Sequence, residues 1–173
     1  MTTISKKNIF KTSLAAAAFC LLVSQTGFAQ KKKIVPKETG SEIVIKGNKS
    51  NSYFTVSQNK PSTITVDGPG KLTVHTRVVL KEGATHSDPL ILKYVQDDKK
   101  QKVKTIRGLD KAPNFLSETK PVTIAQSEII KVLPGKHTYR FYKKDTKEEV
   151  CLNFVYKKDP DPVWEDITPA AKL

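Results

Sequence analysis

Apolar and polar residues alternate with a period of two along most of this chain. Between residues 71 and 80, Leu72, Val74 and Val78 fall on one side, whereas His75 and Arg77 fall on the other. Successive side chains of a β-strand point to opposite faces, so this alternation predicts a strand with one apolar face. The same pattern, rich in Val, Ile, Thr, Tyr and Phe, predicts strands at 42–46, 53–57, 62–67, 71–80, 90–96, 102–106, 122–126, 129–133, 137–143 and 149–157.

Turn-forming stretches such as GNKSN, DGPG, LPGK and KKDTKE separate these segments. After residue 29 no segment has the i, i+3, i+4, i+7 apolar stripe of an amphipathic helix. The pattern favours an all-β fold, an antiparallel β-sandwich of immunoglobulin-like or jelly-roll-like type with about 9–10 strands. The apolar side of the alternation predicts a core of Ile64, Val66, Leu72, Val74, Val78, Leu90, Leu92, Tyr94, Val122, Ile124, Tyr139, Phe141, Val150, Leu152, Phe154 and Tyr156.

The first 29 residues have the three parts of a secretory signal peptide. Lysines without acids occur in MTTISKKNIFK, the apolar run TSLAAAAFCLLV follows, and the small residues of SQTGFAQ predict cleavage after Ala29. Two alternatives stay open, an N-terminal anchor helix and a lipoprotein acylated at Cys20, although Phe19 is bulky for lipoprotein processing. No stretch reaches the roughly 20 apolar residues of a membrane span, so we expect no transmembrane segment in the mature chain.

Four parts are expected along the chain. They are the signal peptide (1–29), a flexible basic leader (30–41), a β-sandwich domain (42–158) and a Pro-rich C-terminal tail (159–173). Cleavage leaves 144 residues, enough for one domain with a core. Within the domain, the alternation fails over RGLDKAPNFLSETK, which predicts a surface loop at 107–120. Arg107 and Phe115 are the candidate functional residues of this loop, with Phe115 either filling the core or contacting a ligand.

The chain is strongly basic, with a formal net charge of +13, which becomes +10 when the three lysines of the signal peptide are removed. Of its 30 basic residues, three are arginine. Lysine is a hydrated point charge, whereas arginine captures phosphate and carboxylate in a bidentate fork, so this surface predicts diffuse attraction to polyanions. No helix-turn-helix pattern, zinc spacing or aromatic RNP-like strand is present, and we expect no nucleic-acid partner.

The sequence lacks the common motifs of catalytic and cofactor sites. His75, His86 and His137 form no HExxH or HxH pattern, and there is no GxSxG, Walker loop or GxGxxG. We therefore expect no cofactor, no metal site, no catalytic residue and no enzymatic activity. A Ser-His-Asp set or a carboxylate pair assembled from separate strands is the alternative. Cys151 is the only cysteine after residue 29, so we expect no intramolecular disulfide and a strand thiol among apolar neighbours.

Five residues outside the loop are candidates for binding. His75 and Arg77 share one strand face, and Arg140 and Tyr142 share another. If these faces adjoin, they form a basic, aromatic-bearing patch that suits an anionic sugar or a carboxylate-rich partner. The alternative is an ordinary solvated sheet face. Trp164, the only tryptophan, is a candidate tail anchor or ligand platform.

The stretch LPGKHTYRF, residues 133–141, resembles the late strand-entry turn of immunoglobulin-like sandwiches, including starch- and glycogen-binding modules. The resemblance covers nine residues and assigns no family.

The sequence favours an exported, non-enzymatic binding or accessory protein of the bacterial cell envelope, in the periplasm, outside the cell or on its surface. Its Lys-rich surface would meet an anionic polysaccharide, lipopolysaccharide or a cell-envelope protein. The first alternative is a carbohydrate-binding module. The second is a small secreted hydrolase or an inhibitor of one.

Overall fold

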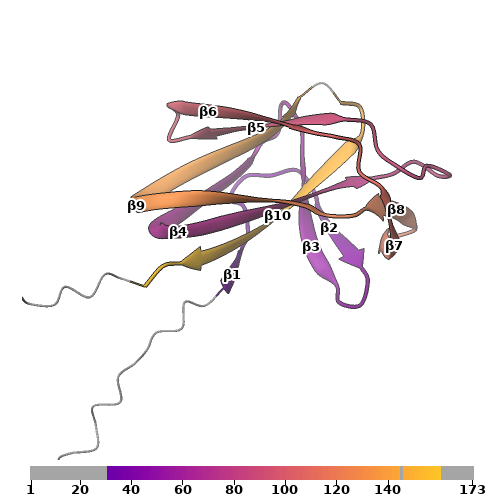
Figure 1. The fold of residues 1–173 in the computed structure, drawn as a ribbon, viewed down its shortest axis with the longest axis horizontal. Coiled ribbons are helices and arrows are strands. Elements are labelled where there is room, and N and C mark those ends of the chain that lie inside the picture. The colour runs from indigo at the N-terminus through magenta and orange to yellow at the C-terminus, as the bar shows by residue number, and fades with distance from the viewer. Residues whose placement is uncertain (1–30, 145, 161–173) are drawn as a thin grey trace, which may run out of the picture.

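The computed structural model describes residues 31–144 and 146–160, which form strands and the connections between them (Figure 1). The strands are β1 (Lys31–Ile34), β2 (Glu42–Lys46), β3 (Asn51–Val56), β4 (Ser62–Val79), β5 (Leu90–Gln96), β6 (Lys100–Ile106), β7 (Lys111–Ser117), β8 (Lys120–Thr123), β9 (Gln126–Lys144) and β10 (Glu149–Lys158). They form one antiparallel sheet in the order β1-β10-β3-β2-β7-β8-β4-β9-β5-β6, and β10 also pairs with β4. This confirms the predicted all-β, antiparallel fold, which is consistent with a β-sandwich.

Several predictions concern residues beyond this part of the chain. The signal peptide, with its cleavage after Ala29 and its Cys20, lies outside the described residues, as do residues 161–173 with Trp164. Within the described residues, no helix is long and apolar enough to cross a membrane.

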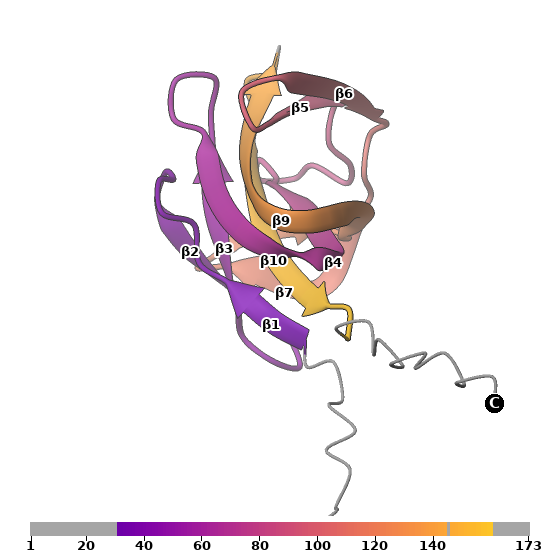
Figure 2. The ribbon, with the colours of Figure 1, turned by 90° about the vertical axis from the view of Figure 1, so that its left-hand side faces the viewer.

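The sheet bends over into two layers, one containing β10 and the other containing β5 and β6, and two strands run through both (Figure 2). The sequence predicts separate strands at 62–67 and 71–80 and at 129–133 and 137–143, but the structure joins each pair into one long bent strand, β4 and β9. The two predicted turns lie opposite each other, with Gly68 paired to Gly135. Because the strands bend together, their pairing continues through the corner. In Figure 2, β9 curves from the layer that contains β10 toward β5 and β6.

A one-residue bulge at this corner changes which side of β9 faces the core. Between Gly68 and Gly70 the register of β4 against β9 shifts, so that Gly70 pairs with Val132. Two residues of β9 there oppose one residue of β4, the arrangement of a β-bulge. Ile130 and Val132 are buried before the bulge, whereas Tyr139 and Phe141 are buried after it.

The main core lies between the two layers. Its largest fully buried side chains include Tyr139, Phe141 and Phe154, and the Phe141 and Phe154 ring centroids are 5.2 Å apart. The predicted core residues are buried here, with two differences. Ile124 follows the end of β8 and is 46% exposed. Val122 is buried but belongs to a second, smaller cluster.

That second cluster fills a closed ring of six paired strands. The pairings run from β10 to β3, β2, β7, β8, β4 and back to β10. Ile45, Tyr53, Val79, Val122 and Cys151 are buried inside the ring. The other face of β10 contributes Val150, Leu152 and Phe154 to the main core, so this strand is buried on both sides.

Two segments that the sequence predicts as irregular contain strands. The predicted flexible leader, 30–41, contains β1, in which Ile34 pairs with Phe154. The predicted loop, 107–120, contains most of the β7–β8 hairpin. Proline and a left-handed Asn114 (φ 62°) interrupt the alternation there, and the register shifts within the hairpin. The strands still pair despite these interruptions. Because the interruptions break the alternation, the sequence pattern does not reveal the hairpin.

Candidate functional site

Arg77 lies inside the second cluster and not on a solvated face. Only 9% of its surface is exposed, because the β7–β8 hairpin covers this side of β4. Its Nε donates to the Tyr53 hydroxyl at 3.2 Å, and its Nη1 donates to the Thr123 carbonyl. The guanidinium carbon is 4.6 Å from the Phe115 ring centroid and 5.8 Å from that of Tyr53. Arg77 therefore joins β3, β4, β7 and β8 as a structural residue.

His75 lies two residues earlier on β4 and is half-buried. Its Nδ1 is 2.7 Å from the Ser127 hydroxyl oxygen. Burial, and then the charge of Arg77, lower the pKa of His75 below its ordinary value of 6.5. The imidazole is therefore mainly neutral at pH 7, and it does not supply the cation that the predicted patch requires.

Arg140 and Tyr142 lie on the other half of β9. Arg140 forms an ion pair with Asp98, and the Lys93 ammonium lies 5.8 Å from the Tyr142 ring centroid. The β4 partner of Arg140 is Thr63, twelve residues before His75 along the bent strand. The structure therefore keeps the two halves of the predicted patch apart.

The loop candidates also separate. Phe115 packs against the second cluster and covers Arg77, which agrees with the expectation that it fills a core. Arg107 is exposed and follows β6. Cys151 is fully buried, and burial raises the pKa of its thiol. No cluster of three metal-ligating side chains occurs within residues 31–144 and 146–160.

Pairing of the strands brings together a set of residues that sequence reasoning missed. Lys31 of β1 lies opposite Lys157 of β10, Lys157 lies opposite Lys71 of β4, and Lys71 lies opposite Lys131 of β9. Directly opposed residues of neighbouring strands share a face, so the four side chains lie side by side. All four are exposed. We call these residues the lysine row.

Along the strand direction, the lysine row has a further lysine among apolar and neutral residues on one side, and a carboxylate beside Lys157 on the other. The next row along the same face consists of Lys33, Val155, Thr73 and Ile129. On the other side, Asp159 lies two residues after Lys157, directly after the end of β10. At strand spacings of about 4.8 Å, the row extends over about 15 Å.

The sequence contains one signal for the row, and it is incomplete. Lys71, Lys131 and Lys157 occupy outward positions of predicted strands, whereas Lys31 belongs to the predicted flexible leader. Which outward lysines become neighbours depends on strand order and register, and these are set by contacts between distant segments. The predicted Lys-rich surface is therefore correct for these residues, but its most concentrated part could not be located.

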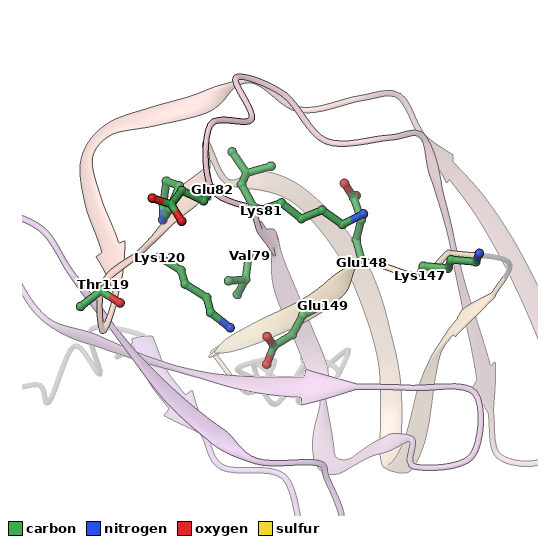
Figure 3. Close-up of a pocket in the computed structure, with 10 residues that line it drawn as sticks. Val79, Lys81, Glu82, Thr119, Lys120, Lys147, Glu148 and Glu149 are labelled. Atoms are coloured by element: carbon green, nitrogen blue, oxygen red, sulfur yellow. The ribbon is translucent and has the colours of Figure 1, made fainter.

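Two hollows lie at the opposite end of β10. One, of about 560 Å³, is lined by the ends of β4 and β10 and by the β7–β8 turn (Figure 3). The other, of about 450 Å³, shares Lys147 and Glu149 with it. In Figure 3, three lysines and three glutamates line the first hollow: Lys81, Lys120, Lys147, Glu82, Glu148 and Glu149. These charges balance, and none of the residues lining either hollow is aromatic. The lysine row is therefore the stronger candidate site for an anion.

No protein-family model and no curated protein matches the chain. Three solved structures are similar over part of their length. An exo-β-1,3-galactanase from Phanerochaete chrysosporium has a TM-score of 0.46 at 12% identity, covering 73% of this chain and 29% of the other. A family GH115 4-O-methyl-α-glucuronidase has a TM-score of 0.42 at 14% identity, covering 76% and 18%. A Paenibacillus cycloisomaltooligosaccharide glucanotransferase has a TM-score of 0.40 at 11% identity, also covering 76% and 18%. The chain thus spans less than a third of each, and likeness of this extent carries no argument about its function.

Proposed function

We propose that this protein is an exported, non-catalytic binding protein whose lysine row holds an anionic polysaccharide. The observation that carries the proposal is the row itself, with four exposed ammonium groups on four adjacent strands. Like charges placed directly opposite each other destabilise a sheet. A polyanion bound along the row would remove that repulsion.

The dimensions of the row favour a polymer over a small anion. A single carboxylate or phosphate reaches one or two lysines, whereas the row extends over about 15 Å across the strands. Its members are hydrated point charges, which suit repeated contact with a flexible chain better than bidentate capture of one group. An extended acidic polysaccharide, free or as the glycan part of lipopolysaccharide, fits this arrangement.

Export and location rest on the sequence. The predicted signal peptide would deliver the mature chain to the periplasm or the cell surface, where acidic glycans are accessible. Mass measurement of the chain recovered from the cell envelope tests this part, since the proposal requires a protein that begins at Gln30. Recovery of the unprocessed chain from the cytosol would contradict it.

Binding to heparin, used as a soluble acidic polysaccharide, tests the site. We expect the dissociation constant to rise steeply with salt, because exposed charges are screened over about 8 Å at physiological ionic strength. The variant Lys71→Gln/Lys131→Gln should bind about 30-fold more weakly, taking about 1 kcal/mol for each lysine near an anionic surface. Lipopolysaccharide in a parallel titration separates a free glycan from a lipid-linked one.

A matched variant controls for the loss of charge. Lys46 and Lys111 are exposed, and they lie opposite Leu116 and Thr123 and not opposite lysine. Lys46→Gln/Lys111→Gln should retain nearly all of the heparin affinity. Equal weakening in the two double variants would show that net charge alone acts. Equally tight binding of neutral dextran would favour the alternative of a carbohydrate-binding module.

A further inference from the structure

Half of β9 has an open edge. From Gln126 to Val132 this strand pairs with β4 on one side, and its pairing with β5 begins only at Tyr139. Within residues 31–144 and 146–160, no strand pairs with the other side of this half. In an antiparallel strand, backbone N–H and C=O groups that do not face the paired neighbour point away from it. This stretch can therefore accept another strand.

The side chains of the open half differ from those of the other sheet edges. The strands at the two ends of the sheet order, β1 and β6, each carry three lysines, in KKKI and KQKVKTI. Lysines on an edge strand discourage pairing with other chains. The open half of β9 carries a single lysine, Lys131, between two large exposed apolar residues, Ile129 (67% exposed) and Leu133 (49% exposed).

We propose that this edge, Gln126–Leu133, binds an extended segment of a partner protein that has an acidic residue with an apolar residue two positions to either side. A strand added in antiparallel orientation would place one of its residues directly opposite Lys131. An acidic residue at that position would pair with Lys131, the last member of the lysine row, whose other neighbour is Lys71. The residues two positions away then lie opposite Ile129 and Leu133.

The lysine row makes this edge prefer a partner with an acidic residue. The added residue joins a line of four lysines, so their combined field favours a carboxylate and opposes an ammonium group. The apolar contacts fix the register, because a slip of one residue moves every side chain of the added strand to the other face. Main-chain hydrogen bonds supply affinity, and this pattern of three side chains supplies selectivity.

Two other occupants are possible, and the experiment separates them. A second copy of this chain could pair through the same edge, but it would bring its own lysine row. The segment 161–173 of the same chain contains Val163, Glu165 and Ile167 in the required spacing. It lies outside the described residues and enters here by its sequence alone.

Titration of the mature protein with a short synthetic peptide tests the proposal. The peptide carries a central glutamate, valine and isoleucine two positions to either side, and threonine elsewhere. A second peptide has lysine in place of the glutamate. We expect the wild-type chain to prefer the glutamate peptide roughly fivefold, and Lys131→Glu to reverse that preference. N-methylation of the peptide amides that face β9 should abolish binding, because strand addition requires them.

A pair of matched substitutions locates the edge. Ile129→Lys places a second lysine on the open edge of β9 and should remove peptide binding. Val103→Lys, at an exposed position of edge strand β6, should leave peptide binding unchanged. Circular dichroism establishes that both variants fold. Loss of binding in Val103→Lys alone would overturn the proposal.

The remaining outcomes concern the alternative occupants. Concentration-dependent dimers of the wild-type chain that Ile129→Lys abolishes would assign the edge to a second copy and overturn the proposal. The proposal would also be overturned if the wild-type chain did not bind the peptide and the Glu165→Lys variant did. In that case segment 161–173 of the same chain would occupy the edge of the wild type. Heparin binding is measured without the peptide, so a protein that binds heparin but not the peptide would contradict this proposal alone and leave the polysaccharide proposal standing.

Discussion

Removing the charge of Lys71 should make the fold more stable while weakening its proposed function. Lys71 is an inner member of the lysine row, with Lys157 on one side and Lys131 on the other. In the unfolded chain these residues are far apart in sequence, so the repulsion exists only in the folded state. Lys71→Gln keeps the length and polarity of the side chain and removes the charge.

The magnitude follows from the spacing of the row. Directly opposed side chains lie about 5 Å apart at their Cβ atoms. Two unit charges at that distance in water repel by about 0.8 kcal/mol, and physiological salt reduces this by about half. Two neighbours give about 0.9 kcal/mol, which is an upper limit because the ammonium groups can splay apart. At 0.01 M salt, where the screening length is about 30 Å, the same sum is about 1.4 kcal/mol.

Urea unfolding at two ionic strengths measures this difference. We expect Lys71→Gln to raise the free energy of unfolding, and to raise it more at low salt. Lys31→Gln should gain about half as much, because Lys31 ends the row and has one lysine opposite it. Lys46→Gln should gain little. A Lys71→Gln variant that is no more stable than the wild type at low salt would refute the idea that repulsion within the lysine row destabilises the folded state.

Three further predictions concern the two cores and one surface ion pair. Arg77→Ala should lower the free energy of unfolding by about 3 kcal/mol in urea titrations, since it removes hydrogen bonds to Tyr53 and Thr123, and Arg77→Lys should restore only part of this. Tyr139→Phe should raise the free energy of unfolding by about 1 kcal/mol, because the buried hydroxyl has no hydrogen-bond partner among the described residues, and burial raises its pKa to about 12. A less stable variant would contradict this. The hydrogen bond between His137 and Asp97 raises the pKa of the histidine and lowers that of the aspartate. Its contribution should therefore be largest between pH 3.8 and 6.5, fading as pH rises through the raised histidine pKa or falls through the lowered aspartate pKa. Thermal unfolding of Asp97→Asn against wild type across this range checks it, and a constant difference would oppose it.

Local alternation predicted those features that depend on one strand at a time. It gave the bounds of β2 and β5 as the structure has them and placed Leu72, Val74 and Phe154 in the core. A buried face imposes its own period on the residues that form it, and this explains why the pattern sufficed there.

The candidate sites depend on which strands become neighbours, and here the pattern was insufficient. Alternation placed Arg77 on the polar side of β4 correctly, but only the β7–β8 hairpin decides that this side is covered. The lysine row likewise combines residues from 31 to 157, whose proximity depends on strand order. The long strands β4 and β9 were divided because glycine and proline signal a turn equally well at a bend.

The bulge in β9 has a consequence for how this chain can change over time. Since the strand presents even-numbered residues inward before the corner and odd-numbered residues after it, the corner acts as a phase shift between two layers. Exchanging one corner residue for another leaves that phase intact. Deleting a single residue there would turn Tyr139 and Phe141 outward and bring Thr138 and Arg140 into the interior. Apart from Gly68, where a Cβ would overlap the Leu133 carbonyl oxygen, and Gly70 and Gly135, which are similarly restricted by contact and by a positive φ, the corner should therefore tolerate substitution more readily than a change in length.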